Sequence, residues 1–174
     1  LMLLVNPSVP AKNVQELIAL ARAKPGELTH SSAGNGTGSH LSAELFKAMT
    51  KTDMVHVPYK GVAPGLLDVV SGRVTMTFAT LASALPQVRS GKLRALAVTG
   101  AKRSPAAPEV PTIAESSITG YEASTWYGVV APAATLPAIV DTISTQLAHA
   151  LKAADVRDRL SHEGMDLAGS TPAQ

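Results

Sequence analysis

The stretch SSAGNGTGSH, residues 31–40, decides how this chain folds. It holds three glycines and no large apolar side chain, and it lies between two segments with regular apolar patterns. We expect a short strand before it, at 28–32, and a helix after it. The apolar face of that helix is expected to consist of Leu41, Leu45, Ala48 and Met49. The order strand, glycine-rich turn, helix is typical of an α/β fold.

The same alternation continues on both sides of this stretch. Further strands are expected in the opening LMLLVNP and at 54–57, 74–78 and 93–98. Asn13 and Glu16 have capping-box spacing before a helix with the apolar stripe Val14, Leu17, Ile18 and Ala21. Two more helices are expected, one with Pro64 in its first turn and one over 81–88. The pattern predicts a mostly parallel sheet flanked by helices, with ligands at the carboxyl ends of strands.

A proline-rich segment interrupts this alternation after residue 101. It contains RSPAAPEVPT and is expected to be a stiff connector over 102–123. Residues 1–101 would then form one α/β lobe. Residues 124–174 would hold a strand at 124–131 and two helices, at about 137–153 and 155–163.

Composition limits the function classes. The chain has 174 residues, of which 45% are hydrophobic and 16% charged, so a packed globular interior is expected. The formal charge is only +2 and the basic residues are scattered, which argues against a nucleic-acid partner. Aromatic residues make up only 3% of the chain, which favours a small polar ligand. Cysteine is absent, which excludes thiolate chemistry.

Two interpretations of the glycine-rich stretch remain open. It is either a plain turn between strand and helix or a cradle for an anion, because free N–H groups and the helix dipole attract negative charge there. A dinucleotide fingerprint would need a glycine in place of Ser39, and the Gly-Lys-Ser/Thr of a phosphate-binding P-loop is missing. Ser31, Ser32 and Thr37 add hydroxyl donors.

The sequence gives little support for catalysis or metal binding. Ser39 and His40 are adjacent, but neighbours on a helix point in different directions, and no G-x-S-x-G elbow occurs. His56 is expected to be a core histidine, whereas His40 could reach either a ligand or a nearby carbonyl. We expect no metal and no cofactor, because no ligand spacing exists among the histidines at 30, 40, 56, 149 and 162.

A second loop, PYKG at 58–61, is expected to meet the glycine-rich stretch at the same edge of the sheet. Lys60 there offers a charge to an anion, and Tyr59 offers a hydroxyl and an apolar ring face. The alternative is a solvated lysine beside a tyrosine that only packs.

Several long segments resemble the solute-binding receptors of tripartite tricarboxylate transporters, also called Bug receptors. They are SSAGNGTGSHLSAELF, VHVPYKGVAPGLLDVVSGRV, GKLRALAVTGAKRSPAAPEVPTIAE and WYGVVAPAATLP. The resemblance implies a type II periplasmic-binding-protein fold and a ligand such as a di- or tricarboxylate, an amino acid or nicotinate. It implies ligand contacts from Ser31, Ser32, Gly34, Gly36, Thr37, Gly38, Ser39, His40, Tyr59, Lys60, Gly61, Phe78, Ala79 and Thr80.

The resemblance also implies partners and a location. A periplasmic receptor would deliver its ligand to membrane permease subunits, although the chain shows no signal peptide. Receptors of this family carry a first lobe that we do not find, so a truncated receptor is expected. Two alternatives remain: a small hydrolase or phosphate-handling enzyme that uses loop 31–40, and a ligand-free lobe stabilised by self-association, for example as a homodimer.

Overall fold

The computed structural model describes the chain over residues 1–116, 118–162, 164–165 and 167–172. The chain divides into two compact units, Leu1–Thr125 and Trp126–Gln174. None of the helices in these described ranges is long and apolar enough to cross a membrane.

The first unit contains one five-stranded sheet. Its strands are β1 (Met2–Val5), β2 (Thr29–Ser32), β3 (Val55–Pro58), β4 (Met76–Ala79) and β5 (Arg94–Val98). They lie in the order β3-β2-β4-β1-β5. β2 is parallel to β3 and β4, while β1 is antiparallel to both of its neighbours, β4 and β5. Four strands therefore run in one direction, which confirms the mostly parallel sheet, and the expected strands agree with these bounds to within about two residues.

Four helices cover this sheet. They are α1 (Val14–Ala23), α2 (Gly38–Thr50), α3 (Val62–Val70) and α4 (Leu81–Arg89). The capping box is confirmed at α1, where the Asn13 side chain accepts the Glu16 N–H at 2.8 Å and the Glu16 carboxylate accepts the Lys12 N–H at 2.7 Å. Pro64 lies in the first turn of α3, where its missing N–H leaves no bond unmade.

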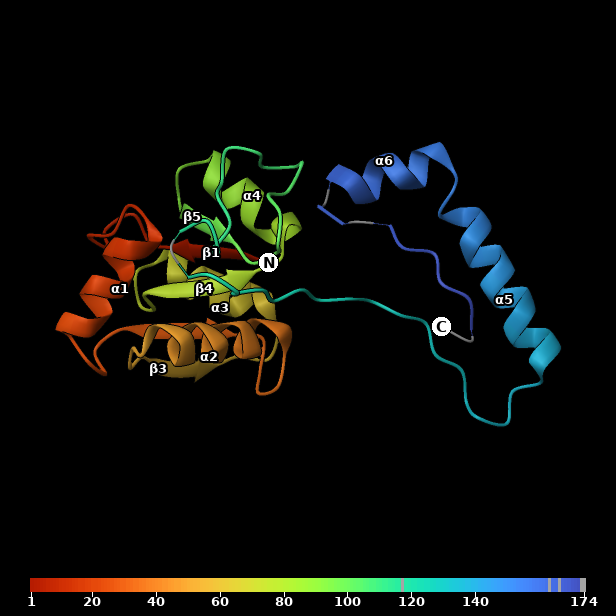
Figure 1. The fold of residues 1–174 in the computed structure, drawn as a ribbon, viewed down its shortest axis with the longest axis horizontal. Helices are drawn as coiled ribbons and strands as arrows, with labels where there is room; N and C mark the ends of the chain where they lie inside the picture. The colour runs from red at the N-terminus through yellow and green to blue at the C-terminus, as the bar shows by residue number, and fades with distance from the viewer. Residues whose placement is uncertain (117, 163, 166, 173–174) are drawn as a thin grey trace. The chain divides into compact units, whose positions relative to one another are not determined.

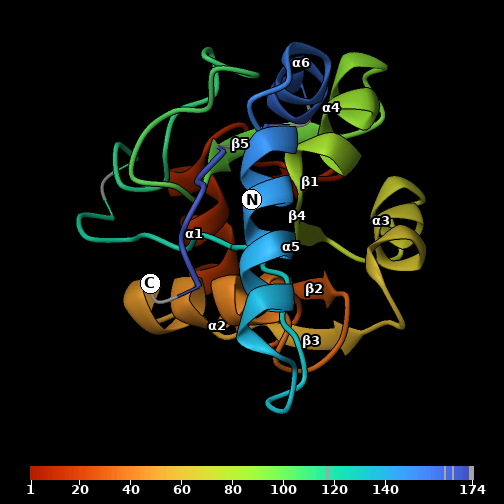
Figure 2. The ribbon, with the colours of Figure 1, turned by 90° about the vertical axis from the view of Figure 1, so that its right-hand side faces the viewer.

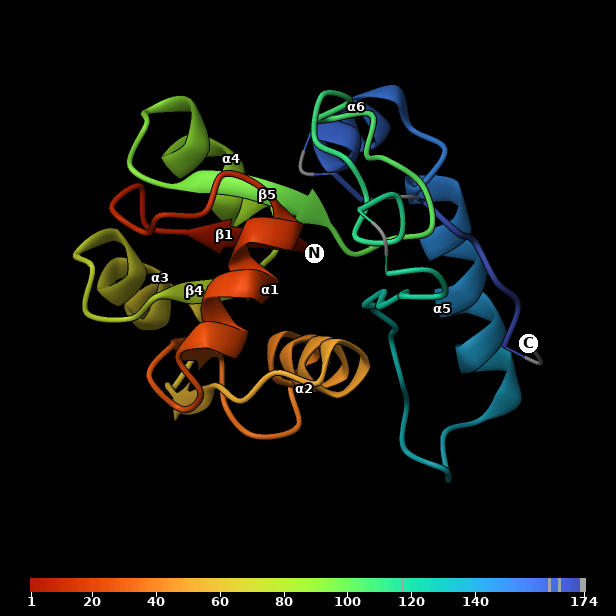
Figure 3. The ribbon, with the colours of Figure 1, turned by 60° about the vertical axis from the view of Figure 1, so that its left-hand side comes forward.

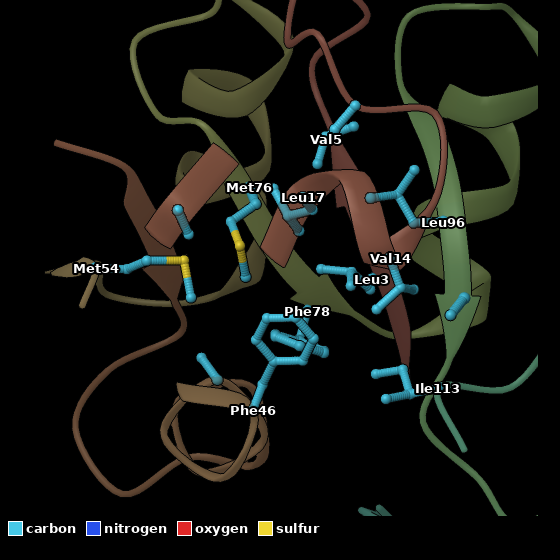
Figure 4. Close-up of a cluster of buried hydrophobic side chains, with 14 of the residues drawn as sticks. Leu3, Val5, Val14, Leu17, Phe46, Met54, Met76, Phe78, Leu96 and Ile113 are labelled. Carbon is cyan, nitrogen blue, oxygen red and sulfur yellow. The ribbon is translucent and has the colours of Figure 1, made fainter. Parts of the chain in front are cut away.

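The helices form two outer layers (Figures 1, 2 and 3). One hydrophobic cluster joins α1 and α2 to one face of the sheet, and Figure 4 shows Phe46 of α2 against Phe78 of β4 within it. A second cluster joins α3 and α4 to the other face. β1 serves both layers, because Leu3 belongs to the first cluster and Leu4 to the second.

The orientation of α2 differs from the expectation. Leu41, Leu45, Ala48 and Met49 lie on its exposed side, with Leu41 58% exposed. The buried side carries Ser39, Ser42, Ala43, Phe46 and Thr50 instead. Small side chains let the helix approach the sheet closely, and the one large ring fills the remaining space. In addition, the Tyr121 hydroxyl donates to the Ser42 carbonyl at 2.9 Å, which further fixes this side inward.

The proline-rich segment 102–123 is part of the first unit. Ile113 and Tyr121 join the cluster under α1 and α2, whereas Ala107 and Val110 join the cluster under α3 and α4. The segment therefore contributes side chains to both hydrophobic clusters. The division into lobes at residues 101 and 124 stays a prediction.

The second unit contains α5 (Pro137–Ala150) and α6 (Ala154–His162). Both expected helices exist, although the strand expected at 124–131 does not form. Most of this segment is exposed and it pairs with no described strand, and a strand needs a neighbour to satisfy its backbone. α5 has no buried residue, and its apolar stripe of Leu136, Ile139, Ile143 and Leu147 is exposed. Self-association through this stripe stays a prediction.

Candidate functional site

Three helix N-termini lie at one edge of the sheet. The parallel strands β2, β4 and β3 end at Ser32, Ala79 and Pro58, and each is followed by a turn into α2, α4 or α3. The turns after β2 and β3 are bonded together, because the Gly61 N–H donates to the Ala33 carbonyl at 3.1 Å. This confirms that the glycine-rich stretch and PYKG meet at the carboxyl edge.

The hydroxyl groups of the glycine-rich stretch bind its own backbone. Ser32 Oγ accepts the Gly34 N–H at 3.1 Å, and Ser39 Oγ accepts the Ala33 N–H at 3.0 Å. Thr37 Oγ1 donates to the Gly34 carbonyl at 2.7 Å. Three of the hydroxyls that we expected to face a ligand therefore hold the loop in a defined shape.

Ser31 behaves differently from its neighbours. Its side chain is only 1% exposed, and its Oγ has no hydrogen-bond partner in the part of the chain that the structure describes. It faces α3, where a Cβ added to Gly65 would lie 3.1 Å from this oxygen. The glycine at 65 thus permits the close packing of α3 against β2.

Two of the loop glycines have backbone conformations that other residues rarely adopt. Gly34 has φ +132° and Gly36 has φ +75°. Gly38 serves a different purpose, since a Cβ at this position would collide with the exposed side chain of Thr125, which would have to shift. The bare backbone of the stretch therefore serves both sharp turning and close approach.

The N-terminus of α2 is not capped by a side chain. Thr37 occupies the N-cap position, but it makes no side-chain capping bond in the described structure. The N–H groups of Gly38, Ser39 and His40 precede the first complete turn, so they have no carbonyl partner within the helix. Together with the helix dipole, these N–H groups suit a carboxylate or another anion.

The second loop adds one further uncapped helix. Gly61 is the N-cap of α3 with φ +118°, again without a side-chain capping bond in the described residues. The Tyr59 hydroxyl donates to Asp68 Oδ2 at 2.6 Å, and this bond, together with burial and the negative charge, raises the pKa of Tyr59. Lys60 is exposed. The tyrosine hydroxyl is thus bonded within the protein, whereas the lysine charge is open to solvent.

The third strand end contributes mainly structure. Phe78 is 1% exposed, and its ring lies 6.1 Å from that of Phe46, so its side chain belongs to the core. Ala79 is also buried. Thr80 caps α4, because its Oγ1 accepts the Ser83 N–H at 3.4 Å and lies 2.9 Å from Ser83 Oγ. A ligand contact from these three residues stays a prediction.

Three histidines lie together next to the glycine-rich loop, an arrangement that we did not predict from the sequence. The ring centroids of His30 and His56 are 4.9 Å apart, and those of His40 and His56 are 4.1 Å apart, with nearly parallel planes. His30 and His56 are direct partners in the β2–β3 pairing. That pairing could have been found by aligning the two expected parallel strands. His40 lies four residues before Glu44, a spacing that places both side chains on one side of a helix.

The environment keeps the inner histidine neutral. Burial, helped by the charges of neighbouring groups, lowers the pKa of His30 to about 4. Burial and the charge of His40 also lower the pKa of His56. Glu44 Oε1 lies 3.4 Å from His30 Nε2, although the geometry of that contact is not that of a hydrogen bond.

Glu44 is itself held in the ionised form. Burial alone would raise its pKa, but the hydrogen bond from Lys47 Nζ at 2.9 Å and the lysine charge bring the pKa below its ordinary value. The lysine thus partly neutralises the carboxylate that the histidines face.

The site has limited means for catalysis. His56 Nε2 lies 2.6 Å from Ser32 Oγ, which brings a base to a hydroxyl. However, the carboxylate of Glu44 contacts His30 and His40, and Ser32 is already bonded to the loop backbone. No cluster of three or more metal-ligating side chains occurs among the described residues.

A cavity of about 440 Å³ lies away from this edge, between α1 and the C-terminal turn of α2. Ile18, Arg22 and Met49 line it, and the Arg22 guanidinium donates to the Thr50 carbonyl at 2.7 Å. None of the expected ligand-binding residues contributes to its lining. We therefore place the candidate site at the strand ends.

Comparisons with known proteins identify relatives of this chain. The chain is 34% identical to Protein BugT of Bordetella pertussis, in a match that covers all of this chain and 53% of BugT. It is 38% identical to a protein of Pseudomonas sp. strain P51, described as a UPF0065 protein in an intergenic region, over 92% of this chain and 48% of the relative. The chain thus spans about half the length of these two curated relatives.

Solved structures match both fold and sequence. An R. palustris protein solved with adipate superposes with a TM-score of 0.94 at 40% identity, covering 99% of this chain and 57% of that chain. MatC from Rhodopseudomonas palustris with bound malate gives a TM-score of 0.88 at 31% identity, covering 94% and 55%. The periplasmic binding protein BugD gives 0.87 at 29% identity, covering 94% and 55%.

These structures confirm the periplasmic-binding-protein-like α/β fold that the sequence predicts. The family described as "Tripartite tricarboxylate transporter family receptor" matches residues 1–174. The chain therefore belongs to the tripartite tricarboxylate transporter receptor family.

Proposed function

We propose that this chain captures a small carboxylate in the periplasm and delivers it to the membrane subunits of a tripartite tricarboxylate transporter. The observation that carries this proposal is the family match over the whole chain, together with the adipate and malate held by two of its structural relatives. Both ligands are dicarboxylates, and we assign the same ligand class to this chain. The residues expected to bind it are those of loop 31–40, PYKG and the β4–α4 turn.

The geometry of the strand ends supports this ligand class. α2 and α3 begin next to each other, joined by the bond between Gly61 N–H and the Ala33 carbonyl, and neither has a side-chain capping bond in its described structure. A carboxylate placed there would accept hydrogen bonds from the first N–H groups of these helices, which have no carbonyl partner within the helix. It would also interact favourably with both helix dipoles. Lys60, which is exposed, would add long-range attraction.

The hydrolase alternative has one observation in its favour, the 2.6 Å contact between Ser32 and His56. A working nucleophile also needs a group that orients the base and donors for the oxyanion. Here the Gly34 N–H is used by Ser32 itself, and Glu44 contacts the other two histidines. We therefore propose binding, not hydrolysis, at this edge.

Isothermal titration of the 174-residue chain with adipate, malate, a tricarboxylate, an amino acid and nicotinate tests this proposal. We expect saturable heat with a dicarboxylate and none with 1,6-hexanediol, which has the chain length of adipate without its charges. The double variant Gly36→Val, Gly38→Val should lose the signal, with circular dichroism showing whether its helices persist. Heat from none of the carboxylates, or equal heat from the diol, would contradict the proposal.

A further inference from the structure

The histidine stack contacts the glycine-rich loop through specific atoms. His40 Nδ1 accepts the N–H of Gly36 at 3.1 Å. His56 Nε2 lies 2.6 Å from Ser32 Oγ, which in turn accepts the Gly34 N–H at 3.1 Å. The two sharply turned glycines of the loop are therefore each linked to an imidazole, one directly and one through a serine.

The contact with Gly36 depends on the protonation state of His40. An imidazole nitrogen accepts a hydrogen bond only while it carries no proton, so the ring must be neutral with its hydrogen on Nε2. Protonation at Nδ1 would place two N–H donors against each other at 3.1 Å. The ring would have to turn away, and the turn at Gly36 would lose the partner that holds it.

Charged groups of both signs surround the stack. The described ionisable groups that act on it are His30 from β2, His56 from β3, and His40, Glu44 and Lys47 from α2. Glu44 Oε1 lies 3.9 Å from His40 Nε2, but Lys47 Nζ is closer to the same oxygen, at 2.9 Å. The ring of His40 is stacked on that of His56, with centroids 4.1 Å apart, and burial together with the charge of His40 lowers the pKa of His56.

We propose that His40 is a positioning residue: its neutral ring, stacked on His56, holds loop 31–40 in the shape that presents the α2 N–H groups, so that carboxylate capture weakens as the pH falls. This inference rests on the proposed function, because it names a regulation of the same site. The charge of a histidine side chain ordinarily changes between pH 5 and 8, and the test covers that range.

An opposite effect has to be weighed. A protonated His40 would also attract an anionic ligand. Its side chain is 21% exposed, so solvent screens this attraction only in part. The opposition between two N–H donors acts at direct contact and also removes the bond that shapes the turn. We therefore expect the loss of loop shape to outweigh the added attraction.

Adipate and malate titrations at pH 8, 7, 6 and 5 test the proposal with two variants. His40→Asn keeps an acceptor, because Asn Oδ1 takes the place of Nδ1, but it does not titrate. His40→Ala removes the acceptor. We expect the wild-type affinity to fall about tenfold towards pH 5, the Asn variant to change much less, and the Ala variant to be about tenfold weaker throughout.

Protonation of the ligand is the same for all three proteins, so the difference between the pH profiles of wild type and the Asn variant isolates His40. Identical profiles for these two proteins would overturn the proposal. A wild-type affinity that rises at acid pH, with the rise lost in the Asn variant, would also overturn it.

A measurement on the ligand-free chain separates this inference from the proposed function. The amide signal of Gly36 in a ¹H–¹⁵N spectrum should shift with pH in step with the His40 ring, and it should stay fixed in His40→Asn. Gly91, which also has positive φ but lies in the turn after α4, serves as the internal control. If no carboxylate binds, the proposed function fails, while a Gly36 amide that ignores His40 titration overturns the inference by itself.

Discussion

The strands β2 and β4 are parallel neighbours, but the turns that follow them are built on different principles. His30 and Ser31 of β2 pair with Met76 and Thr77 of β4, so the two strands occupy equivalent places in the sheet. β2 leads through a glycine-rich loop into an uncapped helix. β4 leads through one residue, Thr80, whose hydroxyl caps the next helix.

The difference shows how one topology can produce one helix N-terminus without a side-chain cap and one with such a cap. In the β2–α2 junction (residues 29–40), hydroxyls and an imidazole hold the loop, and no side-chain cap is bonded to the start of α2 in the described structure. In the β4–α4 junction (residues 76–83), Met76 and Phe78 fill the core, and the N–H of Ser83 is already bonded. The fold positions both helices, and the local side chains decide which is available to a ligand.

The largest expected effect comes from exchanging His30 for the methionine found opposite it in β4. The pKa of His30 is about 4 in the folded protein against about 6.5 in an unfolded chain, so the unfolded chain binds the proton more readily. The free energy of unfolding should be highest above pH 6.5, fall as the pH drops, and level off below pH 4. The loss is up to about 3 kcal/mol, and His30→Met should remove most of it.

Urea denaturation followed by circular dichroism at several pH values measures this effect. Met76→Leu, a change at the paired position of β4, is the matched control and should keep the wild-type pH dependence. A wild-type profile that is flat between pH 7.5 and 4, or an unchanged slope in His30→Met, would show that the histidine is not held neutral by burial.

The second effect tests the close approach of the glycine-rich loop. Gly38→Val should destabilise the protein by about 2 kcal/mol, because the new side chain collides with Thr125. Adding Thr125→Ala should restore about half of that loss. Gly36→Ala should cost about 1 kcal/mol for backbone strain alone, since no atom lies within 4 Å of its added Cβ. A Gly38 variant that Thr125→Ala does not rescue would contradict the collision.

Much of this architecture could be predicted from local patterns. The succession of short strand-like segments and helical patterns located all five strands of the first unit, and the capping box at Asn13 and Glu16 fixed the start of α1. These signals are short-range, since each depends on residues within one turn or one strand. The prediction that loop 31–40 and PYKG lie at the same edge of the sheet followed from strand direction alone.

Contacts between distant segments could not be predicted in the same way. The prediction of which side of α2 faces the sheet was wrong. It followed the more hydrophobic side chains, Leu41 and Leu45, but the smaller Ser42 and Ala43 pack more closely on the sheet. The histidine stack needs the register between β2 and β3, which no single segment contains. The strand expected at 124–131 fails for the same reason, since pattern alone does not supply a partner.

A smaller effect is expected from capping α2 as α4 is capped. Thr37→Asp would place a carboxylate over the N–H groups of Gly38 and Ser39, where it would occupy them and repel an anionic ligand. We expect about tenfold weaker binding of adipate by titration. Thr37→Asn provides the same shape without the charge and should bind more tightly than the Asp variant. Equal affinity in Thr37→Asp and wild type would show that the ligand does not use this helix end.

The smallest effect is expected at the capped junction itself. Thr80→Ala removes the hydroxyl that accepts the Ser83 N–H, so the protein should lose about 1 kcal/mol of stability or less, while Thr80→Ser should retain it. Adipate affinity should change little, because the hydroxyl already lies 2.9 Å from Ser83 Oγ and serves the helix. A tenfold loss of affinity in Thr80→Ala, with stability unchanged, would instead make Thr80 a ligand donor, and the β4–α4 junction would then belong to the binding site with the β2–α2 junction.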